Sequence, residues 1–323
     1  MKKFVIVALA LALTACSTEP QPKEDTQPTE EPAETTEQAE AEEEEEEAPA
    51  EEAEAASMRE LLEQAAEGDH RSAKNIARNE YRNPIDTLLF FGIERDMTVV
   101  ELWPGGGWYT EVLAPALTEG TLIGANFAPK EDDPDHYRTK LHNAYKQRMA
   151  DEEIFSNVEP ITFQPPEQNE LGEPGSADMV LTFRNTHSFI SAGVEDQVME
   201  SAYEVLEPGG IFGVVQHRAE EGADVEETVE DGYVPEAYVI EKAEEAGFEL
   251  VEKSDINANP ADTKDHPEGV WTLPPSLRLG DEDREKYEEI GESDRMTLKF
   301  QKPAEEADEM DEDEMDEDEM DDE

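Results

Sequence analysis

The chain has 323 residues, and its 85 acidic side chains outnumber its 25 lysines and arginines, which gives a net charge of −60. A surface of this sign repels phosphates, so the composition argues against a nucleic-acid-binding protein. Residues 58–303 alone hold 53 acidic and 22 basic side chains. Such an acidic folded part is typical of adaptation to salty surroundings, where counterions screen self-repulsion, and a basic partner is the alternative.

Residues 1–15 predict a secretory signal peptide, because two lysines precede an apolar run that ends in small residues. The sequence Leu13-Thr14-Ala15-Cys16 resembles the bacterial lipobox, and Cys16 is the only cysteine. The resemblance implies lipidation of Cys16 and attachment to the membrane. Ser17 implies sorting to the periplasmic face of the outer membrane of a Gram-negative bacterium. The alternative is an ordinary signal peptide with an incidental cysteine.

Acidic segments of low complexity flank the predicted folded part, residues 58–303. Residues 16–57 contain no large apolar side chain, so they cannot bury enough surface to offset their ordering entropy and are predicted to be disordered. Residues 304–323 repeat an acidic pentapeptide. We expect this tail to be a solvated charge run, with loose binding of divalent cations as the alternative.

Helical and strand patterns alternate along residues 58–303, which predicts an α/β domain with a mostly parallel sheet. The predicted helices cover residues 58–67, 72–81, 85–91, 109–117, 134–149, 195–206 and 234–246. The predicted strands cover residues 97–102, 121–127, 158–163, 178–183, 211–216, 248–253 and 296–301. The last two strands lack a helical pattern between them and are expected to pair as an antiparallel edge. The connection 257–294 is long enough for a functional loop or lid, and Trp271 within it is expected to pack.

Residues 99–109 predict a strand, a tight turn and the start of a helix. Glu101 lies in the strand, and the glycine cluster 105–107 forms the turn. Glycines let the backbone approach a ligand closely, and a helix N-terminus adds free N–H groups. The dinucleotide-binding pattern would need a glycine at Thr110, and the chain has no P-loop sequence.

The turn resembles motif I of class I S-adenosylmethionine-dependent methyltransferases, in which an acid precedes a Gly-x-Gly-x-Gly pattern. Residues 178–183, 206–212 and 243–248 resemble three further segments of that family. The resemblance covers roughly residues 72–303 and implies a Rossmann-like sandwich with a seven-stranded sheet in the order 3-2-1-4-5-7-6. More narrowly, Ala77-Arg78, Tyr81-Arg82, Arg184-Asn185-x-His187 and residues 103–111 and 259–262 resemble exported bacterial proteins called predicted methyltransferases.

The resemblance implies site residues at the carboxyl ends of the strands. The implied cofactor-binding residues are Glu101, Trp103, Gly105, Gly106, Gly107 and Asn126, and the implied catalytic residues are Arg184, Asn185, His187 and His217. Trp103 replaces the first glycine of the motif. Asn126 stands near the position of the acid that binds the ribose in the family, so both departures affect how the cofactor would lie. The two histidines are the best general bases by pKa. Trp108 and Tyr109 are expected to be cofactor walls or packing residues.

The expected activity is methyl transfer from S-adenosylmethionine to a small molecule. No metal site is expected, because His136 and His142 lie six residues apart on a predicted helix and so face different sides. The main alternative is a non-catalytic exported binding module that uses the same crevice. The export signal favours this alternative, since S-adenosylmethionine is made in the cytoplasm. A different nucleoside-handling enzyme is a third hypothesis.

Overall fold

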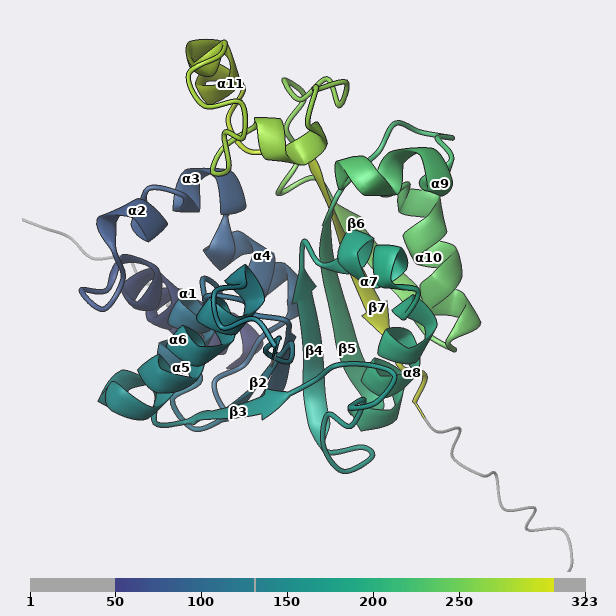
Figure 1. Ribbon diagram of the computed structural model, residues 1–323. Helices are drawn as coiled ribbons and strands as arrows, with labels where there is room; N and C mark the ends of the chain where they lie inside the picture. Colours follow the sequence, from purple (N-terminus) through teal and green to yellow (C-terminus); the bar gives the residue numbers. More distant parts are fainter. Residues whose placement is uncertain (1–49, 131, 305–323) are drawn as a thin grey trace, which may run out of the picture. The chain divides into compact units, whose positions relative to one another are not determined.

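Seven strands form one sheet in the order β3-β2-β1-β4-β5-β7-β6, which confirms the predicted order (Figure 1). The computed structural model describes residues 50–130 and 132–304, with side chains from Ser57 onward. The strands are β1 (Thr98–Leu102), β2 (Thr121–Asn126), β3 (Val158–Thr162), β4 (Ala177–Phe183), β5 (Leu206–His217), β6 (Glu249–Ser254) and β7 (Arg295–Gln301). Strands β1 to β5 pair in parallel, and β7 is antiparallel to β5 and β6. The predicted antiparallel edge is therefore confirmed.

Helices of very different length connect these strands. The α-helices of the described residues are α1 (Ala50–Glu67), α2 (Ala73–Ile76), α3 (Asn79–Arg82), α4 (Pro84–Phe91), α5 (Thr110–Ala116), α6 (Tyr137–Asp151), α7 (Thr186–Ala192), α8 (Glu195–Val205), α9 (Val225–Thr228), α10 (Glu236–Glu245) and α11 (Arg284–Ile290). Short 3-10 helices lie at η1 (Glu153–Phe155), η2 (Val229–Asp231) and η3 (Gly269–Thr272).

Some helices differ from the sequence prediction. Helix α1 begins upstream of its predicted start at residue 58, and the predicted helix 72–81 is two short helices, α2 and α3. Helices α7, α9 and α11, of 7, 4 and 7 residues, have no predicted counterpart. The segment between β6 and β7 thus contains a helix, α11, which the sequence pattern does not reveal.

Strand β5 begins at Leu206, earlier than the predicted start at residue 211. Ala177 of β4 pairs with Leu206 and Met179 pairs with Ile211, so residues 207–210 form a bulge. Gly209 has a φ of 89°, which a residue with a side chain rarely adopts. The Pro-Gly-Gly run at 208–210 therefore follows the end of α8, as predicted, and is accommodated as an irregularity inside the strand.

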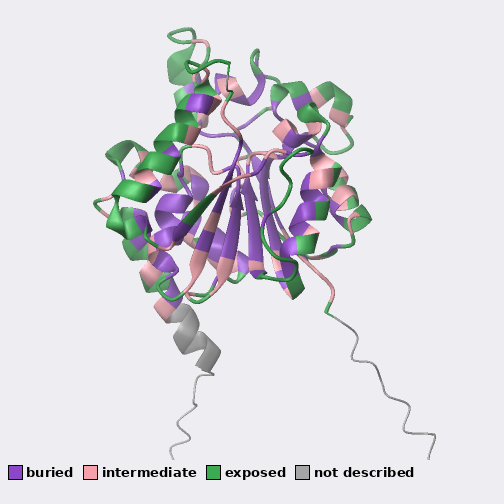
Figure 2. Ribbon diagram, turned by 60° about the horizontal axis from the view of Figure 1, so that its bottom comes forward, coloured by how far each residue is buried: buried purple, intermediate pink, exposed green. Residues whose placement is uncertain are grey.

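Helices cover both faces of the sheet (Figure 2). Successive strand residues point to opposite faces, so Val99 belongs to one hydrophobic core and Val100 to the other. Helices α1, α4, α5 and α6 pack on the first face, for example through Leu113. Helices α7, α8 and α10 pack on the second, for example through Phe189 and Met199. With both faces covered, the carboxyl ends of the parallel strands are where a ligand site is expected.

Buried polar side chains hold the long segment between β6 and β7 in place. The Asp262 carboxylate accepts hydrogen bonds from the Tyr233 hydroxyl (2.9 Å) and the Asp294 backbone N–H (2.8 Å), and it lies 2.8 Å from Nε2 of His266. Asn257 donates to the hydroxyl of Thr87 on α4 at 2.9 Å. These contacts place η3 and α11 beside the carboxyl ends of the strands, at the top of Figure 1.

The terminal segments carry several predictions that the structure does not address. The signal peptide, Cys16 and the linker up to residue 49 lie outside the described residues, as does the tail 305–323. Within the described ranges, no helix is both long enough and apolar enough to cross a membrane.

Replacing Asp262 by alanine should destabilise the protein, because it leaves buried donors on Tyr233 and Asp294 without an acceptor. We expect Asp262→Ala to lower the free energy of unfolding by about 3 kcal/mol in urea denaturation. The exposed Asp281 lies in the same segment, so Asp281→Ala is the matched control and should change stability little. Equal stability of the two variants would show that the segment does not depend on Asp262.

Candidate functional site

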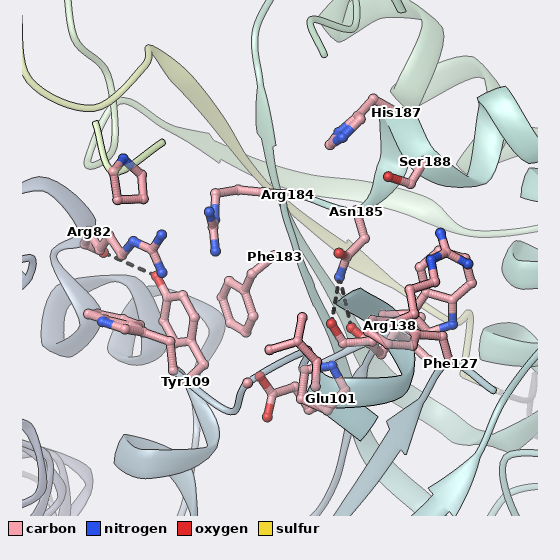
Figure 3. A pocket seen from close by; sticks show the side chains of 18 of the residues that line it. Arg82, Glu101, Tyr109, Phe127, Arg138, Phe183, Arg184, Asn185, His187 and Ser188 are labelled. Carbon is pink, nitrogen blue, oxygen red and sulfur yellow. Dashed lines mark hydrogen bonds between the residues drawn. The ribbon is translucent and has the colours of Figure 1, made fainter. Parts of the chain in front are cut away.

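A cavity of 420 Å³ lies beside the turn that follows β1 (Figure 3). Strand β1 lies between β2 and β4, so the chain crosses to opposite faces on its two sides, and such a switch point is where open α/β sheets bind ligands. Of the predicted site residues, the cavity is lined by Glu101, Trp103, Gly105, Gly106, Arg184, Asn185, His187 and His217. Gly107 and Asn126 are not among the residues that line it.

The turn after β1 alternates into left-handed backbone conformations. Trp103, Gly105 and Gly107 have φ angles of 46°, 60° and 83°. Glycine adopts such angles at no steric cost, whereas a tryptophan there is strained by about 1 kcal/mol. The methyltransferase motif has a glycine at the position of Trp103, and the left-handed backbone there explains why. This chain keeps the left-handed backbone although the residue is a tryptophan.

Asn126 has a different contact from the predicted one. Its side-chain amide donates to the carbonyl of Gly105 (3.0 Å), and its side-chain oxygen accepts from the backbone N–H of Phe127 (3.0 Å). The residue is 1 % exposed. Asn126 therefore holds the glycine turn with both polar atoms of its side chain, and its expected contact with a ribose stays a prediction.

The indole of Trp103 lies in the crevice at the ends of β1 to β3. Its Nε1 donates to the carbonyl of Phe163 just after β3 (2.9 Å), and its ring packs edge-on against Phe127 and Phe189. The guanidinium of Arg138 on α6 lies 4.8 Å from the ring centroid. The side chain is 5 % exposed. Trp103 therefore forms the wall of the cavity on the β3 side.

Glu101 is a buried acid at the floor of the cavity. Burial raises its pKa to about 8, the nearby Glu111 charge adds to this, and a hydrogen bond from the Thr110 hydroxyl (2.5 Å) opposes it. Glu101 is therefore mostly protonated at neutral pH. The sequence places an acid at this position of the motif but does not indicate its protonation state, which follows from burial.

Trp108 and Tyr109 form a second aromatic wall. The Tyr109 ring stacks on Phe183 with centroids 3.5 Å apart, and its hydroxyl donates to the carbonyl of Arg82. The guanidinium groups of Arg71 and Arg82 lie 4.7 and 4.6 Å from the Trp108 ring. Both aromatic side chains line the cavity and also pack, Trp108 against two arginines and Tyr109 against Phe183, and a role as cofactor walls stays a prediction.

Arg184 and Asn185 follow β4, and their side chains differ in their contacts. The Asn185 amide donates to the carbonyls of Leu102 (2.9 Å) and Trp103 (3.3 Å), so it ties the end of β4 to the β1 turn. Arg184 has a φ of 64°. Its guanidinium makes no hydrogen bond or ion pair with the described residues, and its Nε is buried without a partner. Burial lowers the pKa of Arg184 to about 10, which still leaves it charged at neutral pH.

Near Arg184, three more arginines surround the carboxylate of Glu292. Glu292 accepts from Nε of Arg78 (2.7 Å), Nε of Arg82 (3.0 Å) and Nη2 of Arg295 (2.9 Å). We call Arg78, Arg82, Arg184 and Arg295 the arginine cluster. Arg78 and Arg82 line the cavity, but the sequence analysis assigned them no role. Their spacing of four residues in a strongly acidic domain is the signal that could have identified them.

His187 and His217 lie next to each other with ring centroids 5.7 Å apart. Nδ1 of His187 lies 3.3 Å from the amide nitrogen of Gln216, and Nδ1 of His217 lies 2.5 Å from the Ser293 hydroxyl. Burial lowers the pKa of His187 to about 4 and that of His217 well below its usual value, and the Arg184 charge contributes to both shifts. Both rings are therefore neutral at pH 7.

The two histidines considered for a metal make separate contacts. His136 caps the N-terminus of α6 by accepting from the Arg138 N–H, and Nδ1 of His142 lies 2.9 Å from the Phe127 carbonyl. Within residues 50–130 and 132–304, no three histidine, cysteine, aspartate or glutamate side chains lie where they could hold a metal ion.

No protein-family model matches this sequence, and no curated protein matches it. Among solved structures, the chain is similar to the [4+2]-cyclase SpnF at 12% identity and a TM-score of 0.50, covering 76% of this chain and 93% of that one. It is also similar to a SAM-dependent methyltransferase from Aquifex aeolicus (14% identity, TM-score 0.46, 76% and 98% covered). A third similar structure is a geranyl diphosphate methyltransferase in complex with SAM (10% identity, TM-score 0.47, 74% and 94% covered). The strand order establishes the Rossmann-like class I methyltransferase fold.

The raised pKa of Glu101 predicts how stability depends on pH. Between pH 4.5 and 8 the unfolded chain loses the Glu101 proton while the folded protein retains it, so this residue makes folding less favourable as the pH rises. We expect the free energy of unfolding to fall by roughly 4 kcal/mol over this interval relative to Glu101→Gln.

Urea denaturation at several pH values measures this difference, and above pH 8 it should stay constant. The exposed Glu119 provides the control, because Glu119→Gln should follow the wild-type pH dependence. Parallel curves for the wild type and Glu101→Gln would contradict the raised pKa.

Proposed function

We propose that the protein is an S-adenosylmethionine-dependent methyltransferase whose acceptor is a small molecule. The observation that supports this most is the cavity at the switch point, which opens directly onto the glycine turn and Glu101. When bound, S-adenosylmethionine supplies an electrophilic methyl group on a positively charged sulfur. A cavity of 420 Å³ is within the range of about 300–1,000 Å³ typical of small-molecule sites.

The residues of the turn fit such a cofactor at its methionine end. A Cβ atom at Gly105 would meet no protein atom within 4 Å and would point into open space beside the cavity. Gly105 thus leaves room for a ligand against the backbone. Glu101 would hold the amino group, and the Tyr109 and Phe183 rings offer π-faces to a cation. Among the described residues that line the cavity, Glu101 is the acid, and Asn126 is used by the turn, so no carboxylate of the lining is left for the ribose end.

The chain's own contribution to the reaction would be binding and orientation, which hold two reactants at attacking distance. His187 is neutral, and its Nδ1 accepts a hydrogen bond from the Gln216 amide at 3.3 Å, so Nε2 carries the ring proton and would donate a hydrogen bond to a bound acceptor. Its low pKa makes it a weak base in the empty site. An anion bound beside Arg184 would offset the positive charge that lowers this pKa.

The second candidate is an exported binding module, or an enzyme for another reaction, that uses the same cavity. The position of Trp103 favours it, because the indole occupies the crevice where β1 to β3 end. The similar [4+2]-cyclase is consistent with this alternative, since a shared fold does not imply a shared reaction.

We also propose that Cys16 is lipidated and that the protein faces the periplasm from the outer membrane. The lipobox-like sequence 13–16, the following serine and the lack of any other cysteine support this. The acidic composition of residues 58–303 is consistent with salty surroundings.

Calorimetric titration of the full-length chain with S-adenosylmethionine and S-adenosylhomocysteine tests the methyltransferase proposal. We expect both to bind, and Gly105→Ala to weaken binding by about tenfold or more, because its Cβ enters the cofactor space. Gly175→Ala is the matched control, since Gly175 also has a positive φ and open space around its Cβ but lies outside the cavity. Lack of binding at millimolar ligand would contradict the proposal and favour the second candidate. Equal affinity of Gly105→Ala and the wild type would place the cofactor elsewhere.

Replacing Cys16 by serine should release the protein from the membrane. We expect wild-type protein to fractionate with outer membranes and to incorporate labelled fatty acid, and Cys16→Ser to do neither. Membrane fractionation that is unchanged in Cys16→Ser would contradict the anchor.

A further inference from the structure

The cavity wall has the opposite charge to the rest of the domain. Residues 58–303 carry 53 acidic and 22 basic side chains, yet the cavity is lined by four arginines and a single acid, Glu101. That acid is mostly protonated at neutral pH, because burial raises its pKa to about 8. A cavity wall with the average composition of this acidic domain would be negatively charged. The positive charge of the actual wall therefore points to a ligand of negative charge.

The arginine cluster is not neutralised by the protein. Three of its guanidinium groups share one carboxylate, that of Glu292, and the fourth, that of Arg184, pairs with no described residue. Both terminal nitrogens of Arg82, which is 0% exposed, are buried without a hydrogen-bond partner, as is Nη2 of Arg78. Contact with the Trp108 ring offsets only part of this cost for Arg82. Buried cations without partners are costly, so a bound anion would stabilise the cluster.

These arginines reach the cavity from separate parts of the chain. Arg78 and Arg82 belong to the region of α3, Arg184 follows β4, and Glu292 lies in the segment before β7. In Figure 3, Arg82 and Tyr109 lie on one side of the cavity, His187 and Ser188 lie on the other, and Arg184 lies between them. The left-handed backbone at Arg184 costs free energy, and such strain at a cavity is typical of a functional position.

We propose that Arg78, Arg82 and Arg184 bind an oxyanion group with two negative charges, a phosphate monoester or a pair of carboxylates, on the small molecule that this cavity takes. The planar guanidinium fork matches both groups. S-adenosylmethionine does not supply this charge, because its single carboxylate is outweighed by its ammonium and sulfonium groups. The anion therefore belongs to a second ligand. Assigning that ligand as the methyl acceptor rests on the proposed function, whereas anion binding does not.

The anion is an anchor and not the site of reaction. Arginines withdraw electron density from a bound oxyanion, so its oxygens are poor nucleophiles. Arg184 lies close enough to His187 to lower its pKa. Arg184 and His187 line the same cavity, so a molecule anchored by its anion on Arg184 would extend beside His187.

Calorimetric titration of the full-length chain with methyl phosphate and, separately, with succinate tests the proposal without any cofactor. We expect at least one of them to bind, and its identity distinguishes a phosphate from a dicarboxylate acceptor. Arg184→Gln should weaken that binding by about tenfold or more, since one charge-assisted contact is lost. Arg184→Gln should also melt no lower than the wild type, because the lost group has no internal partner. Arg284→Gln is the matched control, because Arg284 is exposed and pairs only with Glu288 on its own helix.

Three results would overturn the proposal. The first is wild-type protein that binds neither anion below about 10 mM. Arg184→Gln could bind the anion as tightly as the wild type. Alternatively, Arg184→Gln could lose affinity for S-adenosylmethionine and not for the anions, which would assign the cluster to the cofactor's carboxylate. Anion binding that persists in a protein unable to bind S-adenosylmethionine would support the anion site and contradict only the methyltransferase proposal.

Discussion

Two side-chain amides hold the turn on which the cavity depends. Asn126, at the end of β2, donates to the carbonyl of Gly105, and Asn185, after β4, donates to the carbonyls of Leu102 and Trp103. The turn leaves the sheet here, so these carbonyls need side-chain partners in place of a strand. Because one amide comes from each neighbouring strand, the turn is fixed from both sides.

The site is positively charged, whereas the domain around it is negatively charged. The domain is strongly acidic, whereas arginines gather at this site. Glu292 forms ion pairs with Arg78, Arg82 and Arg295. The α3 region, the segment before β7 and β7 itself therefore meet at one ion-pair network. That network forms the wall behind Arg184. The same burial that leaves these arginines short of acceptors also keeps Glu101, His187 and His217 neutral. The cavity is thus a positive site whose titratable acids and bases carry no charge.

Trp103 is the residue by which this site departs from the pattern of its fold. The strand order and the glycine turn are those of a class I methyltransferase fold, and the left-handed backbone at position 103 is what a glycine would favour. A tryptophan at that position places a large ring against Phe127, Phe189 and the Phe163 carbonyl. The crevice over β1 to β3 is therefore narrower than a glycine would leave it. This residue therefore limits how much of the crevice is open to a ligand.

The sequence by itself determined the order of elements, the strand–turn–helix at Glu101 and the positions of Arg184 and His187 after β4. These features are encoded by apolar periodicity and turn residues within a few positions of one another. Only the tertiary structure decided that Asn126 faces the turn, that Glu101 is protonated, and that Arg78 and Arg82 meet Glu292, more than 200 residues away. The physical reason is that burial and long-range pairing set the charge and direction of a side chain, and neither is visible in the local pattern.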